Sequence, residues 1–380
     1  MRGLRGVTPL KLRRPSTLSP FPPAFDKRPP SLPASPPSLP LPFLAPALAR
    51  HIQYKAPRPK RDAHRPLRSV LFTPGSRPDK MRKALTQVPA DVLAFDLEDS
   101  VSYDRKVEAR KAVKEVLSEA PSACAAPRYV TVRVNCQGSQ WWTEDLAAMA
   151  GLARVHAVII PKVQSADTLM TAHELLGRFG ASPAMGIWAM VETPAAVMNI
   201  KEIARSANFV PRLEALMMGT SDLTNELHAL HHPDRVPLLY SLSSCLVAAR
   251  AFKLRVIDGV HLNLNDPNGF AAACAQGRAL GFDGKSLIHP KTVAEANKAF
   301  GPRPEELAHA ERVLTAWREA QAHGEGLAVV DGQLIEVLHA EEAYRLLTMQ
   351  ENIEAIEASV HAQAGMMTHP ATATTSDTAH

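Results

Sequence analysis

Ionisable side chains follow the short apolar segments of this chain at regular intervals. The clearest case is "FDLEDS", residues 95–100, in which Asp96, Glu98 and Asp99 lie within four positions at the end of the apolar segment "DVLAF". Carboxylates at the end of a buried segment cost folding energy unless a cation or a bound molecule uses them. Seven further segments end similarly, at Arg77, at Arg133 with Asn135, and at Lys162, Glu192, Asp222, Asp258 and His289. This mixture of acids and bases suits an anionic substrate that is held through a divalent cation.

Glu192 and Asp222 are the best candidates for a metal pair. Two carboxylates, with waters and substrate oxygens completing the coordination shell, suit Mg²⁺. Zinc and copper are less favoured, because the chain has no CxxC pair and no histidine pair at ligand spacing. Arg133 carries a planar guanidinium that can hold a carboxylate through two hydrogen bonds. A salt bridge to Glu98 or Asp99 is the alternative role for this arginine.

Three basic residues surround the start of the first expected helix. Arg77, Lys80 and Lys83 follow a Pro-Gly turn. A helix N-terminus with nearby cations favours a phosphate group, and a solvated helix face is the alternative.

Eight short apolar segments must position these groups, and each is followed by a helical pattern or a loop. They span 68–73, 91–97, 129–135, 156–162, 185–192, 214–220, 255–261 and 282–289. Continuous apolar segments of this length indicate a parallel sheet that is covered on both faces. We therefore predict an α/β fold, a (β/α)8 TIM barrel over residues 67–302, since such barrels need about 250 residues and hold their active sites at the C-terminal strand ends. A doubly wound open sheet is the alternative, although no G-x-G-x-x-G follows the first strand.

The two ends of the chain differ in composition from the predicted barrel. Residues 1–66 are rich in Arg, Ser and Pro, and Asp26 is the one acidic residue among the first 60. This composition predicts a transit peptide and a mitochondrial location, with a plastid location or a disordered cytosolic tail as alternatives. Residues 303–360 are expected to form C-terminal helices, and residues 361–380 a disordered tail.

Charge and hydropathy exclude two classes of partner. The net charge of +5 arises from the N-terminal segment, which contributes ten net positive charges and leaves the remainder near −5. Because no basic and aromatic stripe is present, we expect no nucleic-acid partner. No apolar run reaches the roughly 18 residues that a membrane helix needs, so we expect no membrane partner. The four cysteines, at 124, 136, 245 and 274, are expected to be unpaired thiols.

A series of motifs connects these observations. The segments "VLFTPGSRPDKMRKA", "FDLEDSV", "VRVN", "VET", "GTSDL" and "GFDGKSLIHP" occur in this order. Together they resemble the HpcH/HpaI aldolase–citrate lyase β-subunit family over residues 68–350. Within this family, the resemblance is strongest to the mitochondrial citrate lyase β-like proteins, which are citramalyl-CoA lyases. The resemblance implies a (β/α)8 barrel, a homotrimer and a C-terminal lid that reaches a neighbouring protomer's site. It also implies Mg²⁺ held by Glu192 and Asp222, a substrate carboxylate held by Arg133, and a CoA thioester arm near Phe72, Lys80 and Lys83.

The lid departs from the family pattern at one functional position. The family lid resembles "DGxxxDxPH", in which the second Asp is the acid/base, whereas residues 331–339 are "DGQLIEVLH". Glu336 replaces the Asp and Leu338 the proline. A misplacement of about 1 Å costs on the order of a hundredfold in rate. Glu336 is therefore either a working substitute or a sign of altered chemistry.

The expected activity is that of a Mg²⁺-dependent carbon–carbon lyase. It would cleave a β-hydroxyacyl-CoA of the citramalyl-CoA or malyl-CoA type reversibly into a 2-keto acid and acetyl-CoA or a homologue. Glu98 and Asp99 would orient Arg133 and the waters of the metal, Asp96 would brace the layer below, and Glu336 would transfer the proton. Glu192 and Asp258 complete the expected substrate-binding set. The alternatives are a metal-dependent aldolase acting on free acids, and a non-catalytic subunit or scaffold of a lyase complex.

Overall fold

The computed structural model describes residues 65–119 and 129–368. The predicted transit peptide lies outside the described residues except for its last two positions. The final helix extends to Thr368, past the start of the tail expected at residue 361, and the rest of that tail lies outside the described residues.

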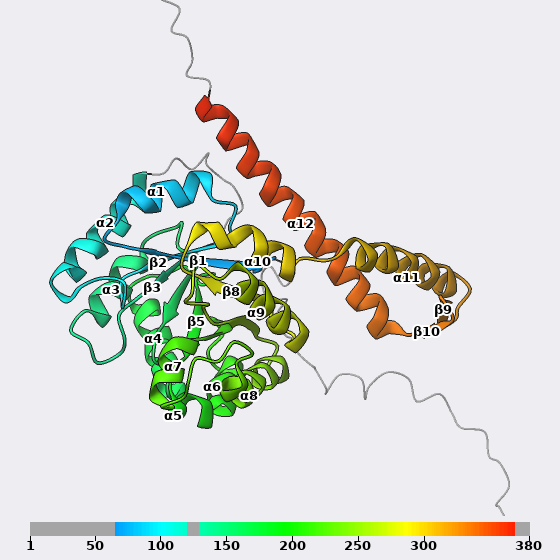
Figure 1. The fold of residues 1–380 in the computed structure, drawn as a ribbon, viewed down its shortest axis with the longest axis horizontal. Helices are drawn as coiled ribbons and strands as arrows, with labels where there is room; N and C mark the ends of the chain where they lie inside the picture. Colours follow the sequence, from blue (N-terminus) through cyan, green and yellow to red (C-terminus); the bar gives the residue numbers. More distant parts are fainter. Residues whose placement is uncertain (1–64, 120–128, 369–380) are drawn as a thin grey trace, which may run out of the picture. The chain divides into compact units, whose positions relative to one another are not determined.

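A closed barrel of eight parallel strands forms the centre of the fold, which confirms the (β/α)8 prediction (Figure 1). Consecutive strands pair along the chain, and β1 closes the ring by pairing with β8. The strands are β1 (Ser69–Pro74), β2 (Val92–Asp96), β3 (Tyr129–Arg133), β4 (Ala157–Ile160), β5 (Gly186–Val191), β6 (Leu213–Met218), β7 (Arg255–Asp258) and β8 (Gly284–Leu287).

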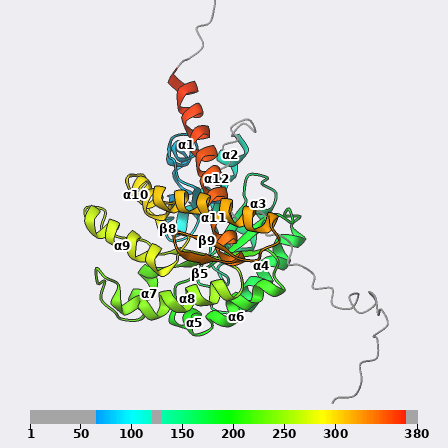
Figure 2. The same cartoon turned by 90° about the vertical axis from the view of Figure 1, so that its right-hand side faces the viewer.

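Helices surround the strands (Figures 1 and 2). Proline occupies the first position of α1, α5 and α9, where its missing N–H costs nothing and its fixed φ favours the helix. The α-helices of the barrel are α1 (Pro78–Gln87), α2 (Lys106–Glu119), α3 (Trp142–Ala150), α4 (Ala166–Arg178), α5 (Pro194–Met198), α6 (Ile200–Arg205), α7 (Thr220–Glu226), α8 (Leu239–Ala251), α9 (Pro267–Leu280) and α10 (Val293–Phe300). Within the described residues the barrel also contains the 3₁₀ turns η2 (Tyr103–Arg105), η3 (Ser206–Asn208), η4 (Val236–Leu238) and η5 (Pro290–Thr292).

Two apolar layers separate the inside of the barrel from the space beneath its helices. The interior layer contains side chains such as Val70, Ala94 and Ile257. The larger outer layer packs the other strand face against the helices, with side chains such as Leu71, Phe95 and Val256. Because successive strand residues point to opposite faces, one position along a strand decides whether a side chain enters the barrel or the helical layer.

The C-terminal segment forms a helical arm with a small hairpin. It comprises α11 (Pro304–Ala322), β9 (Ala328–Val330), β10 (Gln333–Ile335) and α12 (Val337–Thr368). Asp331 and Gly332 connect the two strands, and both have positive φ, as the two central residues of a type I′ turn require. A separate apolar cluster, which includes Val313, Val330 and Ile335, holds the arm together.

The arm also exposes large apolar side chains around the hairpin. They are Leu327, Val329, Leu334, Val337, Leu338 and Tyr344. Among the described residues, no helix is both long and apolar enough to span a membrane.

Candidate active site

The C-terminal ends of the strands surround a cavity of about 250 Å³. Side chains from several strand ends and the loops after them line it. They include Phe72, Asp96, Asp99, Arg133, Met190, Glu192, Thr220, Asp222, Val260 and Ser286. The structure therefore brings Arg133, Asp99, Glu192 and Asp222 to one cavity, as expected from a ring of polar strand ends.

Arg133 is held mainly by Asp96. The two residues are register partners at the ends of β2 and β3. Nε and Nη2 of Arg133 donate to the two carboxylate oxygens of Asp96 at 2.7 and 2.6 Å, and Asp96 also accepts the N–H groups of Glu98 and Ser100. Burial opposes the charged form of Asp96, yet the Arg133 charge and these hydrogen bonds hold the pKa of Asp96 below its usual value. Asp96 therefore orients the arginine, a role that the sequence assigned to Glu98 and Asp99.

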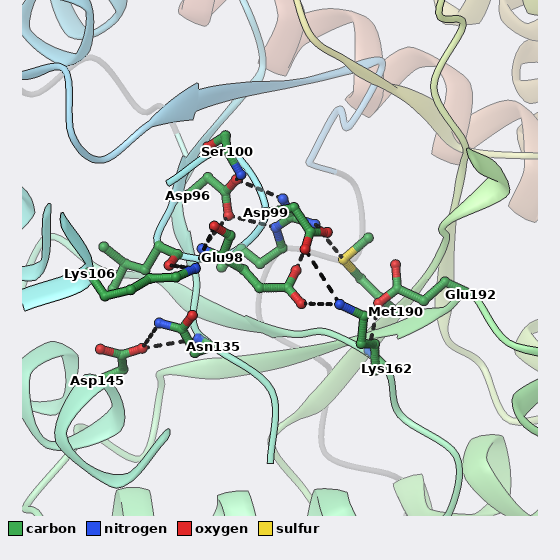
Figure 3. Close-up of polar contacts among 12 residues, drawn as sticks. Asp96, Glu98, Asp99, Ser100, Lys106, Asn135, Asp145, Lys162, Met190 and Glu192 are labelled. Carbon is green, nitrogen blue, oxygen red and sulfur yellow. Dashed lines mark hydrogen bonds and ion pairs between the residues drawn. The ribbon is translucent and has the colours of Figure 1, made fainter. Parts of the chain in front are cut away.

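Glu98 contacts both Arg133 and Lys162, and its contact with Lys162 can be followed in Figure 3. Its Oε2 is 3.0 Å from Nη1 of Arg133 in an ion pair, and its Oε1 accepts a hydrogen bond from Nζ of Lys162 at 2.7 Å. Among the described residues, Oε2 has no hydrogen-bond donor although it is buried. Burial raises the pKa of Glu98 despite the two neighbouring cations. Glu98 thus offers one buried acceptor oxygen at the mouth of the barrel.

Asp99 lies further out than Glu98. Its side chain is about half exposed, and its oxygens are 3.4 Å from both Arg133 and Lys162. Glu98 and Asp99 both contact Arg133, with Asp99 as the weaker partner. Their role in orienting the waters of a cation stays a prediction.

Glu192 is a buried carboxylate whose charge is stabilised by few hydrogen bonds. Its Oε1 accepts the main-chain N–H of Lys162 at 2.6 Å. Burial, followed by the charge of Glu98, raises the pKa of Glu192 to about 8, and Asp222 adds to this shift. A buried carboxylate whose ionisation is opposed by burial and by two neighbouring acids is an arrangement that a bound cation relieves.

Asp222 reaches the same cavity from the first turn of α7. Gly219 precedes this helix, and a Cβ added to it would lie 2.3 Å from Cβ of Glu192. The missing side chain thus allows the end of β6 to approach Glu192 closely. Two carboxylates and no third acidic, histidine or cysteine ligand, within the part of the chain that the structure describes, fit Mg²⁺, which keeps several waters and binds through one or two carboxylates.

Phe72 lines the cavity, and the two candidate lysines lie outside it. The Phe72 ring is 5.1 Å from the Arg133 guanidinium. Lys80 and Lys83 are exposed on α1 and do not line the cavity, while Arg77 pairs with Asp79. Their contact with a CoA arm stays a prediction.

Asp258 faces away from the barrel mouth. Its neighbour Ile257 belongs to the interior layer, so Asp258 points to the helical layer. There its two oxygens accept hydrogen bonds from Arg235 at 2.7 Å, and Lys285 donates to one of them at 2.7 Å. We assign Asp258 a structural role in place of the substrate-binding role expected from sequence.

Glu336 is not brought to the cavity within one chain. It lies between β10 and α12, is exposed, and its main-chain N–H donates to Nδ1 of His339. Its predicted role as the acid/base requires the site of another protomer.

Sequence reasoning missed two contributions to the site. Asp96 was placed below the site, although a strand pair in register would have matched it with Arg133. Lys162 was noted only as a charge after β4, whereas its main chain also contacts Glu192. No sequence signal marks that second contact.

Comparisons with known proteins agree with this geometry. The model of the HpcH/HpaI aldolase/citrate lyase family matches residues 68–290. A (3S)-malyl-CoA thioesterase of Cereibacter sphaeroides is 42% identical over 294 residues, which cover 77% of this chain and 98% of the relative. An L-malyl-CoA/β-methylmalyl-CoA lyase of the same species is 31% identical over 316 residues, covering 77% of this chain and 96% of that lyase.

A solved structure shows the same fold. The protein CitE of Mycobacterium tuberculosis, in complex with magnesium, acetoacetate and coenzyme A, superposes with a TM-score of 0.59 at 30% identity and covers 75% of this chain and 98% of its own. The family resemblance drawn from the sequence motifs is thereby confirmed. The chain is an enzyme of the HpcH/HpaI aldolase/citrate lyase family.

Proposed function

We propose that this enzyme is a Mg²⁺-dependent lyase for a β-hydroxyacyl-CoA of the malyl-CoA or citramalyl-CoA type, which it cleaves reversibly into a 2-keto acid and acetyl-CoA or a homologue. The observation that carries the proposal is the pair Glu192 and Asp222, which faces the same small cavity as Arg133. The relative named as a malyl-CoA/β-methylmalyl-CoA lyase, and the CitE complex with magnesium and coenzyme A, support the substrate class. Coenzyme A in that complex also disfavours an aldolase for free acids.

Glu192 and Asp222 would hold the cation, which when bound supplies a Lewis acid for the oxygens of the hydroxy-acid or keto-acid half of the substrate. Arg133 would bind the carboxylate of the same half. Nε and Nη2 of Arg133 donate to Asp96, whereas Nη1 contacts Glu98 and Asp99. A substrate carboxylate would therefore bind at Nη1 in competition with these two acids. Glu98, whose buried Oε2 accepts no hydrogen bond from the described residues and is ion-paired with Arg133, would orient a bound water or the reacting hydroxyl group.

Cleavage moves the electrons of the Cα–Cβ bond into the thioester enolate, while the hydroxyl releases its proton to solvent and becomes the keto group. The enolate carbon then needs a proton, and we assign this transfer to Glu336 of a second copy of the chain. The apolar side chains around the hairpin support this assignment, since several large exposed apolar side chains in one small segment are typical of a protein interface. A homotrimer, as in the family resemblance, would bring each hairpin to a neighbouring site.

A second candidate is hydrolysis of the same thioester to a free hydroxy acid and CoA. The observation in its favour is the 42% identity to a (3S)-malyl-CoA thioesterase, which spans nearly the whole of that relative. Both reactions would use the same cation and Arg133, and they differ in which bond of the substrate breaks.

One experiment separates the two. The purified enzyme is incubated with malyl-CoA, citramalyl-CoA and β-methylmalyl-CoA, with Mg²⁺ or with chelator, and the products are identified by mass spectrometry. A lyase yields a 2-keto acid with acetyl-CoA or propionyl-CoA, whereas a thioesterase yields free CoA and the hydroxy acid. Glu192→Gln should abolish either reaction. Turnover that survives both chelator and this substitution excludes the metal-dependent site, and inactivity with every ester favours the non-catalytic subunit.

We also propose that residues 1–66 direct the enzyme to mitochondria. The proposal follows from their basic and acid-poor composition. A fluorescent protein fused behind this segment should co-localise with a mitochondrial marker, and plastid import would support the alternative address.

A further inference from the structure

Lys162 has a left-handed backbone conformation next to the candidate metal ligand Glu192. It follows β4 and Pro161 and has a φ of 53°. In this left-handed conformation Cβ crowds the main chain, so glycine is the residue that adopts it at least cost. A lysine that keeps this conformation beside a candidate metal site requires a compensating interaction, because strained residues persist only where their surroundings hold them.

The main chain of Lys162 makes the first such interaction. Its N–H donates to Oε1 of Glu192 at 2.6 Å, and this is the sole hydrogen bond found for the Glu192 side chain among the described residues. The next residue, Val163, donates its N–H to the Met190 carbonyl oxygen at 3.3 Å. The turn after β4 is thus attached to β5 just before the carboxylate that would bind the cation.

The side chain of Lys162 makes the second interaction, with a different strand end. Nζ is 2.7 Å from Oε1 of Glu98 and 3.4 Å from Oδ1 of Asp99 (Figure 3). Lys162 therefore connects the acidic loop after β2 to the carboxylate after β5, with its ammonium group at one end and its amide at the other.

We infer that Lys162 is a positioning residue for the metal site: its ammonium, held by Glu98 and Asp99, keeps its backbone left-handed, and that backbone directs the amide N–H to Glu192. The inference rests on the proposed function, because it takes Glu192 as a ligand of the cation. One oxygen of Glu192 is fixed by the amide, so Oε2 would be the oxygen available to a cation. Groups that orient a ligand in this way typically change metal affinity by about 10- to 100-fold when they are removed.

A merely structural ion pair predicts a different result. In that case, loss of the ammonium would lower the unfolding temperature and leave the affinity for the cation unchanged. A positioning role predicts that the affinity falls even in a variant that folds normally.

The test compares variants at two lysines with the same backbone conformation. Lys162→Met keeps the amide and most of the side-chain stem but removes the charge, and Lys162→Arg keeps the charge. Lys253→Met is the matched control, because Lys253 also has a left-handed φ, 56°, but follows α8 and does not line the cavity. Mn²⁺ binding is measured by electron paramagnetic resonance with Mg²⁺ as competitor, and the unfolding temperature is measured in EDTA.

We expect Lys162→Met to weaken Mn²⁺ binding about 10- to 100-fold, Lys162→Arg to stay within a few-fold of the parent enzyme, and Lys253→Met to equal it. Parent-like Mn²⁺ affinity in Lys162→Met overturns the inference and leaves the proposed function intact. An arginine variant as weak as the methionine variant also overturns it, because the charge would then not hold the backbone. If the parent enzyme binds no Mn²⁺ that Mg²⁺ displaces, the metal site and the inference both fail.

Discussion

Glu192 couples the stability of the metal-free enzyme to pH. Its pKa in the folded protein is about 8, against an ordinary value of 4.5, and burial is the main cause. Between these two values the folded protein binds a proton that the unfolded chain does not. Stability is therefore full below about pH 4.5 and is lost as the pH rises towards 8.

The loss can be estimated from the shift. Each pKa unit corresponds to about 1.4 kcal/mol, so full ionisation of Glu192 costs on the order of 3–5 kcal/mol of unfolding free energy. At about 2–4 °C per kcal/mol, the unfolding temperature of the metal-free enzyme should fall by roughly 10 °C across this range from this carboxylate alone. Glu192→Gln removes the ionisation, so the variant should be more stable than the parent at pH 8 in EDTA.

The assay is thermal unfolding in EDTA and in Mg²⁺ at several pH values from 5 to 8.5. Mg²⁺ should stabilise the parent more strongly as the pH rises, because the cation binds the ionised carboxylate, and it should leave Glu192→Gln unchanged. Equal pH dependence of the two proteins in EDTA would refute the reasoning. So would stabilisation of Glu192→Gln by Mg²⁺ equal to that of the parent.

Three further substitutions test other parts of the site. Arg133→Lys keeps the charge but loses the planar guanidinium group. The value of kcat/KM should therefore fall about 100-fold, as expected for two lost charge-assisted hydrogen bonds. Unchanged steady-state kinetics in this variant would contradict the role of Arg133. Asp96→Asn leaves the buried Arg133 without its bidentate partner and should cost about 3–5 kcal/mol in urea unfolding; a loss below 1 kcal/mol would show that Glu98 suffices. Glu336→Ala should lower kcat by about 10²- to 10⁴-fold with little change in binding of the CoA ester. If Glu336 acts on a neighbouring protomer, an equal mixture of Glu336→Ala and Glu192→Gln should regain about a quarter of the activity after subunit exchange, and no recovery would place the acid/base elsewhere.

The barrel was predictable because several strands, such as β2, β4 and β5, are buried and largely apolar on both faces. Segments such as "HAVIIPK" lack the alternation of a half-exposed strand, and β4 (Ala157–Ile160) is buried throughout. The segments read from sequence ran past the strands to include the polar residues that follow them. The C-terminal hairpin was not predicted as strands, because β9 and β10 have three residues each. Its sequence signal was Asp331-Gly332, a favoured type I′ pair.

The site residues were predictable where the end of a strand alone places a side chain at the cavity. They were not predictable where a shift of one residue decides whether the side chain points into the barrel or towards the helices. Glu192, Asp222 and Arg133 all reach the cavity. Asp258 does not, since the last residue of β7 falls on the helical side, and a shift of one position reverses the side of every residue. Lys162 shows a further limit, because nothing in a lysine indicates a left-handed backbone.

Position 219 has a consequence for anyone who would evolve this enzyme in the laboratory. A methyl group there would lie 2.3 Å from Cβ of Glu192 and 2.4 Å from its Oε2, so even alanine would push that carboxylate aside. In a saturation library, the codon for Gly219 should tolerate no replacement under selection for turnover. Some of the discarded variants should nonetheless accumulate as folded protein, which would separate catalysis from solubility at a residue that has no side chain of its own.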